Sequence, residues 1–225
     1  MPYATKTEDI DLIHFSEGRP KIYIEKLNDI PAKPAYEIGK RFFDFSFALF
    51  LFIILLIPMI IIAVFVRLDS PGRPIYKQTR LGKNQRPFTI YKFRTMYITA
   101  EIDGPRWAKP NDSRSTRLGR ALRHAHLDEL PQLINIIAGQ MSFVGPRPER
   151  PEFYDVFDTY IDGFRQRMLV TPGLTGLAQV HGGYELLPEE KIIYDLEYIK
   201  NRSFSQDLHC IFLTFGLLIT HKGAR

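Results

Sequence analysis

A stretch of 22 residues without a charged side chain, Phe45 to Val66, constrains the fold of this chain more than any other feature. Nearly every side chain in it is large and apolar, and its length matches the roughly 20 residues that cross a bilayer. It begins too far along the chain for a secretory signal, and no small-residue cleavage site follows it. A core helix that is apolar on every face needs protein on all sides, which a chain of 225 residues can hardly supply. We therefore expect a membrane segment rather than a buried core helix.

The charges around this stretch bear on how it enters a membrane. Basic residues flank both ends: Lys33, Lys40 and Arg41 upstream, and Arg67, Arg73, Lys77, Arg80, Lys83 and Arg86 downstream. Because positive charge beside a membrane segment marks the cytoplasmic side, a simple span would place one basic flank outside. Pro58 removes a backbone N–H and clashes with the carbonyl of Ile54, which predicts a kink. We favour a re-entrant helix that penetrates one leaflet, and a kinked full span is the competing interpretation.

The overall charge is consistent with a polyanionic partner. Lys and Arg exceed Asp and Glu by five, and the isoelectric point is near 9.2. Nucleic acid, an anionic lipid surface and a phosphorylated substrate all fit such an excess, and so does plain solubility. The single cysteine, Cys210, excludes an internal disulfide framework and agrees with a reducing compartment.

The rest of the chain shows short elements and no repeat. Residues 1–38 are polar and lack periodicity, so we expect an extension or linker without chemistry. Ile75–Thr79 and Phe88–Met96, joined by a turn at residues 81–84, predict a β-hairpin, and Glu101–Thr116 predicts a loop. Helical spacing appears in four later segments: Leu118–His124, Leu130–Ile137, Glu152–Met168 and Lys191–Lys200. The apolar run Ile211–Thr220 is too short to span. Both it and the aromatic-rich Glu152–Met168 fit either a membrane interface or ordinary core packing.

The first candidate for chemistry is the acidic pair Asp128-Glu129. Pro131 suits the first turn of a helix, so both acids should lie at a helix N-terminus, which favours an ionised carboxylate with a lowered pKa. The same end of a helix attracts phosphate. Such a carboxylate can act as a nucleophile or hold Mg²⁺ against phosphate oxygens. Helix capping alone would explain the pair equally well.

The second set of candidates is cationic. Lys92 and Arg94 are two apart on a predicted strand and would project in one direction, an arrangement that can neutralise a pyrophosphate or remain a solvated face. Arg147 stands between two prolines on a rigid turn, so its guanidinium loses little entropy on binding an anion. A salt bridge that fixes the loop is the alternative for Arg147. Arg123 lies five residues before Asp128.

Two further features carry less information. The glycines of Thr171-Pro-Gly-Leu-Thr-Gly-Leu-Ala-Gln-Val180 allow a tight turn and close backbone approach, but no nucleotide-binding fingerprint is complete. His124 and His126 lack further ligands at metal-type spacing, and we interpret them as incidental. No serine or cysteine nucleophile motif is present.

Taken together, these motifs resemble the bacterial sugar transferase family, the monotopic polyprenyl phosphate phosphoglycosyl transferases. The resemblance extends from Lys40 to Leu218 and rests on ordered blocks: Lys40-Arg41-Phe-Phe-Asp44, Tyr76-Lys77-Gln78-Thr-Arg80-Leu-Gly82, Tyr91-Lys-Phe-Arg-Thr-Met96, Leu127-Asp-Glu-Leu-Pro-Gln132, Met141-Ser-Phe-Val-Gly-Pro-Arg-Pro148, Pro172-Gly-Leu-Thr-Gly-Leu-Ala-Gln179 and Tyr194-Asp-Leu-Glu-Tyr198. So many blocks in order make a chance match very improbable.

The resemblance implies a re-entrant membrane helix joined to a compact catalytic unit on the cytoplasmic face of the bacterial inner membrane. We therefore expect a mostly helical α+β fold: an extension (1–38), a membrane helix (39–67) and a catalytic domain (68–225) with a short hairpin and amphipathic interfacial helices.

It also implies a chemistry. Asp128 would attack the β-phosphate of a UDP-sugar and release UMP, and the phosphate of undecaprenyl or another polyprenyl phosphate would then displace the phosphosugar. Glu129, with Asp128, would hold Mg²⁺, while Arg123 and Arg147 would bind phosphate oxygens and Lys92 and Arg94 are weaker choices for that role. Nucleic acid is not an expected partner, and a homodimer is left open.

Two departures from the family pattern are visible. Many members place Ser before the helix proline, where this chain has Ile57, so a hydroxyl that would help stabilise the kink is missing. Many also carry Arg shortly after the Gln-Val block, where this chain reads His181-Gly182-Gly183-Tyr184, which puts donor contacts in question. The rival hypothesis is a non-catalytic membrane adaptor that binds anionic lipid or nucleic acid through its basic surface. It explains the charge and the apolar stretch but not the acidic pair beside cationic blocks.

Overall fold

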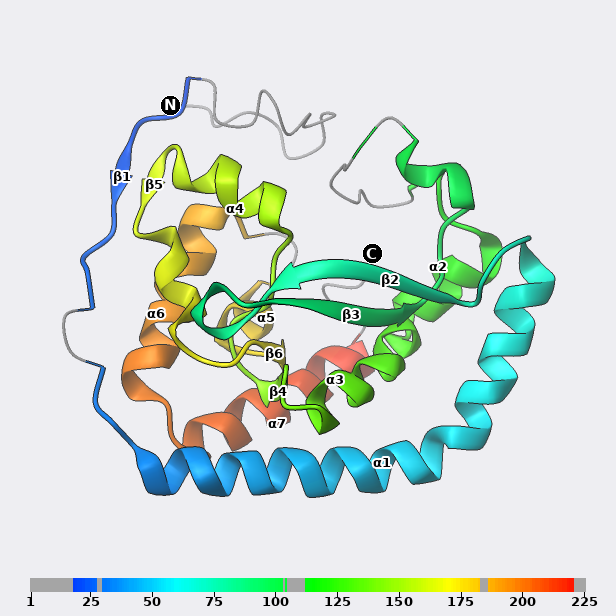
Figure 1. The fold of residues 1–225 in the computed structure, drawn as a ribbon, viewed down its shortest axis with the longest axis horizontal. Helices are drawn as coiled ribbons and strands as arrows, with labels where there is room; N and C mark the ends of the chain where they lie inside the picture. The colour runs from blue at the N-terminus through cyan, green and yellow to red at the C-terminus, as the bar shows by residue number, and fades with distance from the viewer. Residues whose placement is uncertain (1–17, 28–29, 103, 105–111, 183–185, 221–225) are drawn as a thin grey trace.

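The computed structural model describes residues 18–27, 30–102, 104, 112–182 and 186–220. In chain order the helices and strands are β1 (Ile22–Tyr23), α1 (Pro34–Asp69), β2 (Ile75–Leu81), β3 (Pro87–Phe93), α2 (Arg117–His124), α3 (Leu133–Ile137), β4 (Ser142–Val144), α4 (Pro151–Asp158), β5 (Ile161–Asp162), β6 (Gly173–Thr175), α5 (Leu177–His181), α6 (Pro188–Asn201) and α7 (Phe204–Thr220) (Figure 1). Short 3-10 helices lie at Lys83–Gln85, Ile98–Glu101, Leu127–Gln132 and Phe164–Leu169. The described chain is therefore mostly helical with a few short strands, as expected.

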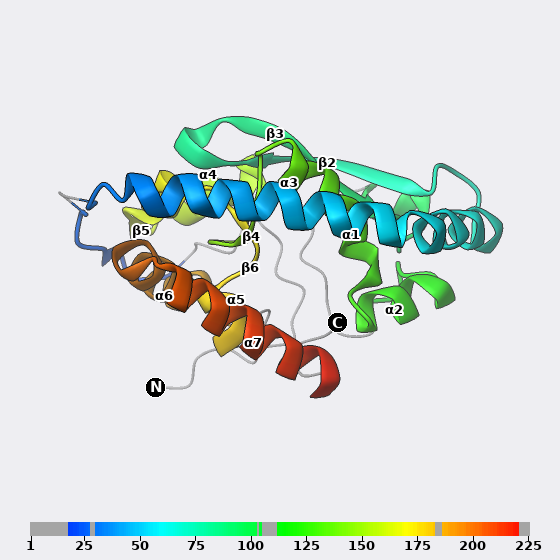
Figure 2. The same ribbon diagram turned by 90° about the horizontal axis from the view of Figure 1, so that it is seen from below.

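The apolar stretch lies within α1, a helix of 36 residues that begins at Pro34 and so starts earlier than the expected boundary at residue 39. Proline suits this first turn because its missing N–H has no partner to lose there. Figures 1 and 2 show α1 running along one side of the molecule and then turning sharply in its C-terminal half. Pro58 lies in that half, and its missing N–H and its clash with the preceding turn account for a bend.

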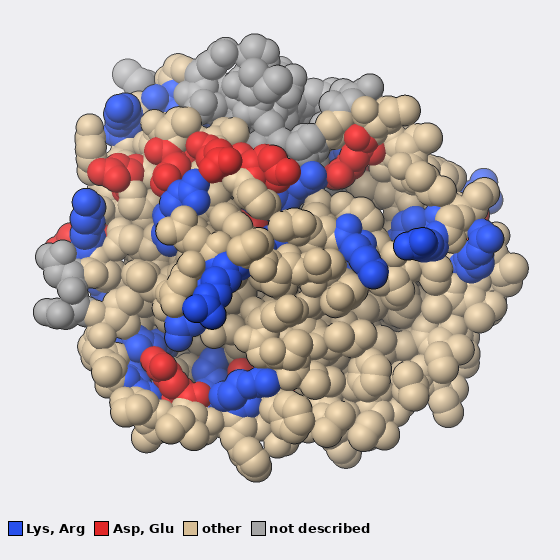
Figure 3. Space-filling view, in the orientation of Figure 1, with Lys and Arg blue, Asp and Glu red and all other residues tan. Residues whose placement is uncertain are grey.

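Most of α1 is not covered by protein. In its most apolar window only 11% of residues are buried inside the molecule, and no other helix of the described chain is long and apolar enough to cross a membrane. The interpretation of this segment as the core helix of a soluble protein is therefore excluded. The lower part of the surface in Figure 3, over α1, is almost free of charge except near the start of the helix.

The predicted hairpin is confirmed. β2 and β3 pair antiparallel from Ile75 opposite Phe93 to Leu81 opposite Pro87. Asn84 and Gln85 in the turn have φ values of 56° and 62°, a left-handed conformation that asparagine tolerates better than most residues. The second strand ends before Arg94, three residues earlier than expected, because the chain there leaves the ladder toward the end of α1.

The aromatic-rich segment forms no single helix. α4 ends at Asp158, strand β5 follows at Ile161–Asp162, and Gly163 with φ 93° starts the 3-10 helix Phe164–Leu169. The prediction of a continuous helix to Met168 is therefore wrong, because a positive φ interrupts helical geometry. The aromatic side chains of this segment are buried in the main core: Phe153, Tyr154, Phe157, Tyr160 and Phe164. Core packing, not a membrane interface, explains their spacing.

Part of the expected N-terminal linker packs on the body of the protein. β1 pairs in parallel with β5, with Ile22 opposite Ile161. Three apolar residues of this segment, Ile24, Leu27 and Ile30, contact the main core. The described part of residues 18–33 is therefore attached to the body of the protein rather than free of it.

A buried polar cluster joins the start of α1 to α6 and α7. The Asp207 carboxylate on α7 accepts hydrogen bonds from Tyr36 (2.9 Å) and Tyr198 (2.8 Å) and pairs with the Lys40 ammonium at 2.7 Å. Farther along, α1 packs Met59 and Val66 against Phe93 of β3 and Leu122 of α2. α1 is thus anchored at both ends while its outer face stays exposed.

α7 is amphipathic, as the spacing of its side chains shows. Asp207 and Cys210 are buried, while four large apolar residues three or four apart are exposed: Phe204, Leu208, Phe212 and Phe215. For the apolar run Ile211–Thr220 the alternatives were core packing and a membrane interface. Core packing accounts only for the buried face of the helix. The exposed face remains available to a membrane.

Candidate functional site

Two glycine-rich segments hold Arg147 in place. β4 and β6 pair in parallel, Ser142 opposite Gly173 and Val144 opposite Thr175, which places the loop after β4 against the loop before α5. A side chain at Gly173 or Gly176 would overlap the backbone of Gly145. The predicted close approach of backbones is confirmed, and it fixes the turn that carries Arg147.

The acidic pair lies in the first turn of the 3-10 helix Leu127–Gln132, which leads into α3. The predicted helix from Leu130 is thus real, but it begins as a 3-10 turn that already contains both acids. His126 precedes the turn with φ 54° and ψ 17°, a left-handed conformation that is unfavourable for histidine. This reversal turns the chain from α2 into the 3-10 helix and brings Asp128 toward Arg123.

Glu129 is held by two cations. Its Oε1 accepts from the Lys92 ammonium at 2.6 Å and from the Arg147 Nη2, and its Oε2 accepts from the Arg147 Nη1 at 3.3 Å. Burial alone would raise the pKa of Glu129. The charges and hydrogen bonds of Arg147 and Lys92 outweigh burial and hold the pKa well below its usual range. Glu129 is therefore an ionised carboxylate in a fixed position.

Asp128 differs from Glu129 both in its hydrogen-bond partners and in its pKa. It is buried, and among the residues that the structure describes none donates a hydrogen bond to its carboxylate. Burial and the charge of Glu129 raise the pKa of Asp128 to about 6, against the lowering effect of Lys92, Arg123 and Arg147. The prediction of a lowered pKa is thus wrong for Asp128, because desolvation exceeds any stabilisation by a short helix end. For Glu129 the direction is right but the cause is two ion pairs.

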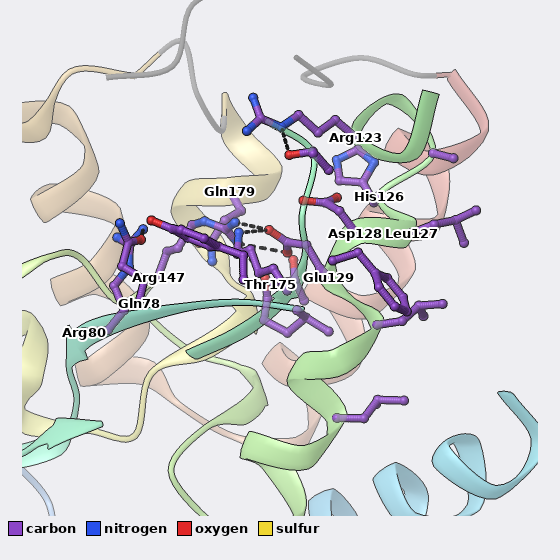
Figure 4. A pocket seen from close by; sticks show the side chains of 18 of the residues that line it. Gln78, Arg80, Arg123, His126, Leu127, Asp128, Glu129, Arg147, Thr175 and Gln179 are labelled. Atoms are coloured by element: carbon purple, nitrogen blue, oxygen red, sulfur yellow. Dashed lines mark hydrogen bonds and ion pairs between the residues drawn. The ribbon is translucent and has the colours of Figure 1, made fainter. Parts of the chain in front are cut away.

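The four predicted cations separate into three that surround the acids and one that does not. Lys92 and Arg147 bind Glu129, and the Arg123 Nε donates to Thr95 Oγ1 at 2.8 Å. No other described residue accepts from the Arg123 guanidinium, so its terminal nitrogens remain available. In Figure 4, Arg123, His126 and Asp128 lie on one side of the pocket and Gln78 and Arg80 on the other, with Glu129 between them.

Arg94 does not join them. Its guanidinium donates to the carbonyl oxygens of Ser70 (2.7 Å), Val66 (3.1 Å) and Pro71, at the C-terminal end of α1. These carbonyls lack partners within the helix, so Arg94 satisfies them and fixes the exit of the chain from α1. The expected pairing of Lys92 and Arg94 on one face is therefore not seen.

A second charged cluster extends the pocket beyond Arg147 and was not predicted. Arg80 donates to Glu149 Oε2 at 3.3 Å and to Gln78 Oε1 at 2.6 Å. Arg167 pairs with Asp195 at 2.7 Å, and both side chains are only 1% exposed. The pKa of Glu149, which burial would raise, is held below its usual range by Lys191, Arg80 and Arg167. Arg80 was quoted above only as a flanking charge and as part of a family block. The spacing of the other members of this cluster along the sequence did not indicate that they meet.

His126 and Gln179 are two further polar residues that line the pocket. The Nδ1 atom of His126 is buried without a hydrogen-bond partner among the described residues, although we had interpreted this histidine as incidental. The amide of Gln179 on α5 is likewise buried without a partner and lies beside Arg147 in Figure 4. Only their positions in the fold bring them to the site.

The acidic pair would offer Mg²⁺ an incomplete set of ligands. No group of three or more described His, Cys, Asp or Glu side chains could hold a metal ion. Mg²⁺ commonly uses one or two carboxylates together with water and substrate phosphates. Asp128 and Glu129 fit this role only if phosphate oxygens complete the shell, since Glu129 is already engaged by two cations.

Ile57 and His181 stand at the two departures from the family pattern. Ile57 is exposed on α1 beside Pro58. His181 stacks on Tyr194, with ring centroids 4.7 Å apart, and its Nδ1 lies 2.9 Å from the Leu177 carbonyl. Gly183 and Tyr184 lie outside the described residues.

Comparison with known proteins identifies the relatives of this arrangement. Residues 35–221 match the model of the family described as bacterial sugar transferase. The chain is 39% identical over 214 residues to an Aeromonas hydrophila UDP-N-acetylgalactosamine-undecaprenyl-phosphate N-acetylgalactosaminephosphotransferase, covering 92% of this chain and 51% of that protein. It is 36% identical over 215 residues to the UDP-glucose:undecaprenyl-phosphate glucose-1-phosphate transferase of Escherichia coli K12, covering 89% and 46%.

A shorter relative is matched over more of its length. The UDP-glucose:undecaprenyl-phosphate glucose-1-phosphate transferase of Caulobacter vibrioides is 38% identical over 195 residues, which is 84% of this chain and 73% of that protein. The chain thus spans about half the length of the first two relatives and nearly three quarters of the third.

Proposed function

Because the chain belongs to the bacterial sugar transferase family, we propose that it transfers a phosphosugar from a UDP-sugar to undecaprenyl or another polyprenyl phosphate. The products are UMP and a polyprenyl diphosphosugar, the first membrane-bound intermediate of a surface or protein-linked glycan. Relatives whose printed names describe such transfers support the substrate class. We also propose that the protein lies on the cytoplasmic face of the inner membrane, with α1 dipping into one leaflet.

The observation that carries this proposal is the contrast between Asp128 and Glu129. Two adjacent carboxylates with opposite pKa shifts have different roles in a reaction. Glu129 is engaged by Lys92 and Arg147 and cannot easily form a bond. Asp128, without a described donor on its oxygens, is free to react. We therefore assign Asp128 as the nucleophile and Glu129 as the group that orients the two cations.

The reaction then has two displacements. In the first, an Asp128 oxygen bonds to the β-phosphorus of the UDP-sugar, and the bond from that phosphorus to the bridging oxygen breaks, so UMP leaves with that oxygen. In the second, an oxygen of the lipid phosphate bonds to the same phosphorus and the Asp128–phosphorus bond breaks. The carboxylate is restored and the phosphosugar is on the lipid.

The cations stabilise charge at the phosphoryl oxygens during both steps. Arg123 is best suited to bind them, since its terminal nitrogens have no acceptor among the described residues. Arg147, on the loop after β4, and Lys92, on β3, reach the same space. Preorganised donors of this kind are commonly the largest contribution to catalysis. Mg²⁺, held by Asp128 or Glu129 together with phosphate oxygens, would add Lewis-acid polarisation of the phosphoryl group.

A single-turnover experiment tests the proposal. Incubation with Mg²⁺ and a panel of UDP-sugars, without lipid, should release about one UMP per protein and add the mass of one phosphosugar to Asp128, because the first displacement needs no acceptor. Asp128→Asn should give neither product, and a chelator should suppress both. Full turnover of Asp128→Asn with the lipid acceptor would show that the nucleophile is wrongly assigned.

The same experiment separates the rival hypothesis. A membrane adaptor would bind anionic vesicles or nucleic acid with a strong dependence on salt and would release no UMP with any donor. The UDP-sugar that gives the fastest UMP release identifies the transferred sugar.

A further inference from the structure

The pocket around Asp128 is one end of a much longer cavity. A volume of about 1440 Å³ is continuous from the charged side chains near Arg123 and Arg147 to a region bounded by α1 and α7. The charged end accounts for the donor and the phosphates of the proposed reaction. The apolar end has no role in that chemistry and needs its own explanation.

The walls of the apolar end come from two helices. On α1 the lining residues are Phe43, Phe47, Leu51 and Leu55, four apart and therefore on one face of the helix. On α7 they include Leu208, Ile211, Phe215 and Leu218. At a rise of 1.5 Å per residue the α1 wall is about 18 Å long. We call this space, with Leu133 and Phe143 between its walls, the α1–α7 groove.

The buried polar cluster determines where the groove is narrow. Lys40 and Tyr36 on α1 contact Asp207 on α7, and the Phe204 ring packs edge-on against Tyr36 at 5.2 Å. Figure 2 shows α1 and α7 close together at this end and diverging toward the C-terminus of α7. The groove therefore opens along its length toward the surface where α1 exposes its apolar side chains.

We propose that the α1–α7 groove holds the isoprenoid tail of the lipid acceptor, with the acceptor phosphate at Arg123 and Asp128. This inference rests on the proposed function and adds the position and direction of the tail. The lining residues of the groove named above carry no charge, so the methyl-branched hydrocarbon chain of an isoprenoid can lie there without burying an unpaired polar group. The outer faces of both helices are apolar, so the rest of the tail passes into the bilayer without crossing water.

The geometry favours an isoprenoid phosphate over a phospholipid. In a polyprenyl phosphate a single tail is joined directly to a terminal phosphate monoester, matching one groove that leads to free donors of Arg123. A phospholipid places a glycerol and a second chain beside a phosphodiester. A phospholipid acyl chain in the groove is the outcome that the experiments must distinguish.

The first experiment fills the groove. Ile211→Trp adds bulk inside it, and Phe212→Trp, at a neighbouring position that is 76% exposed and does not line the cavity, is the matched control. Transfer to a long polyprenyl phosphate should slow by roughly tenfold or more for Ile211→Trp, while UMP release without acceptor stays unchanged. Transfer to a short prenyl phosphate, whose tail does not occupy the groove, should change far less.

Three results would overturn the proposal: equal slowing by both tryptophans, equal slowing with short and long acceptors, or loss of UMP release in Ile211→Trp alone. If the unaltered protein releases no UMP with any donor, the proposed reaction itself has failed. The two failures are thus distinguishable.

The second experiment does not depend on turnover. A polyprenyl phosphate with a photoreactive group in its tail is bound to Asp128→Asn, and crosslinks are mapped by mass spectrometry. They should fall on Leu51, Leu55, Ile211 or Leu218 and not on Ile53 or Phe212, which face outward. Crosslinks confined to the outward residues, or a phospholipid probe that labels the groove and is not displaced by polyprenyl phosphate, would contradict the assignment.

Discussion

At the scale of single residues, neighbours in sequence have opposite roles because their partners come from distant segments. Glu129 forms ion pairs with Lys92 of β3 and with Arg147 after β4, while Asp128 forms an ion pair with neither. Lys92 and Arg94, predicted to act together, diverge: one binds the acid and the other binds carbonyls at the end of α1. Residue types and spacing alone suggested the right set of charged groups but could not assign their partners.

The raised pKa of Asp128 predicts an acidic limit to activity. The carboxylate must be ionised to attack, so UMP release should fall as the pH drops through about 6, with the dependence expected for one proton. Because the pKa of Asp128 in the folded protein exceeds its ordinary value of 3.8, ionisation of Asp128 also lowers stability as the pH rises through this range. The acidic limb, which is the fall in rate at low pH, is measured as single-turnover UMP release from pH 4.5 to 8. This is about the window in which folded proteins are most stable.

Lys92→Gln sharpens that measurement. Lys92 lowers the pKa of Asp128, so its removal should move the acidic limb to higher pH. A limb near pH 4 in the unaltered protein, or a shift to lower pH in Lys92→Gln, would contradict the electrostatic assignment.

Arg94 and Arg123 provide a matched pair of substitutions. Arg94→Gln should lower the free energy of unfolding by about 2–4 kcal/mol, since hydrogen bonds from a charged donor to the α1 carbonyls are lost. The KM for the UDP-sugar in the folded fraction should not change. Arg123→Gln should leave stability nearly unaltered and weaken the donor reaction by roughly tenfold or more.

Denaturant unfolding and initial rates on the same preparations distinguish the two. A raised KM in Arg94→Gln with normal stability would restore the predicted phosphate contact and contradict its role at the helix end.

At the scale of secondary-structure elements, α1 combines a membrane-type sequence with an attachment to protein. The basic residues upstream of the apolar stretch, used above to infer orientation, also bind protein groups: Lys40 pairs with Asp207, and Arg41 donates to the carbonyls of Ile136 and Ile137 at the end of α3. Both ends of the helix are therefore held by the same folded body. A helix anchored at both ends to one body is expected to enter and leave a membrane on one face.

This expectation predicts the accessibility of the two ends of α1. Single cysteines at Ala35 and at Arg73, in a Cys210→Ser background, should both be labelled by a membrane-impermeant thiol reagent only after the cytoplasmic side is opened. The physical reason would be a kink at Pro58 that returns the helix to the face by which it entered. Labelling of Ala35→Cys from outside intact cells, with Arg73→Cys still protected, would establish a full span instead.

At the scale of the whole molecule, a buried polar cluster joins the start of α1 to two helices near the C-terminus. Asp207 accepts from Tyr36 and Tyr198 while pairing with Lys40, so it connects α1, α6 and α7. Removing one member of such a cluster leaves another charge buried without a partner. The same cluster also sets the separation of the two helices that bound the α1–α7 groove.

Asp207→Leu is expected to destabilise the protein by about 3–5 kcal/mol, because the partly buried Lys40 ammonium loses its partner. The double variant Lys40→Met with Asp207→Leu should recover part of that loss, since no uncompensated charge remains. Thermal or denaturant unfolding in detergent measures both. Additive losses in the double variant would show that the pair is not coupled.

How much of the structure could be predicted depends on how far apart along the chain the interacting residues lie. The apolar stretch, the hairpin, α2, α6 and the acidic pair depend on composition and local spacing, and each was predicted from a short window. The break at Gly163, the pairing of β1 with β5 and of β4 with β6, and the end of β3 at Phe93 depend on residues far apart in the chain.

Local sequence by itself therefore determined which segment is apolar enough for a membrane and which charged residues are candidates for the proposed phosphate chemistry. Only the tertiary structure decided that Glu129 is bound by two cations while Asp128 is not, that Arg94 serves the end of α1, and that a cavity joins the acids to α7. The physical reason is that burial and electrostatic pairing depend on distances in space. The spacing of residues along the chain does not contain those distances.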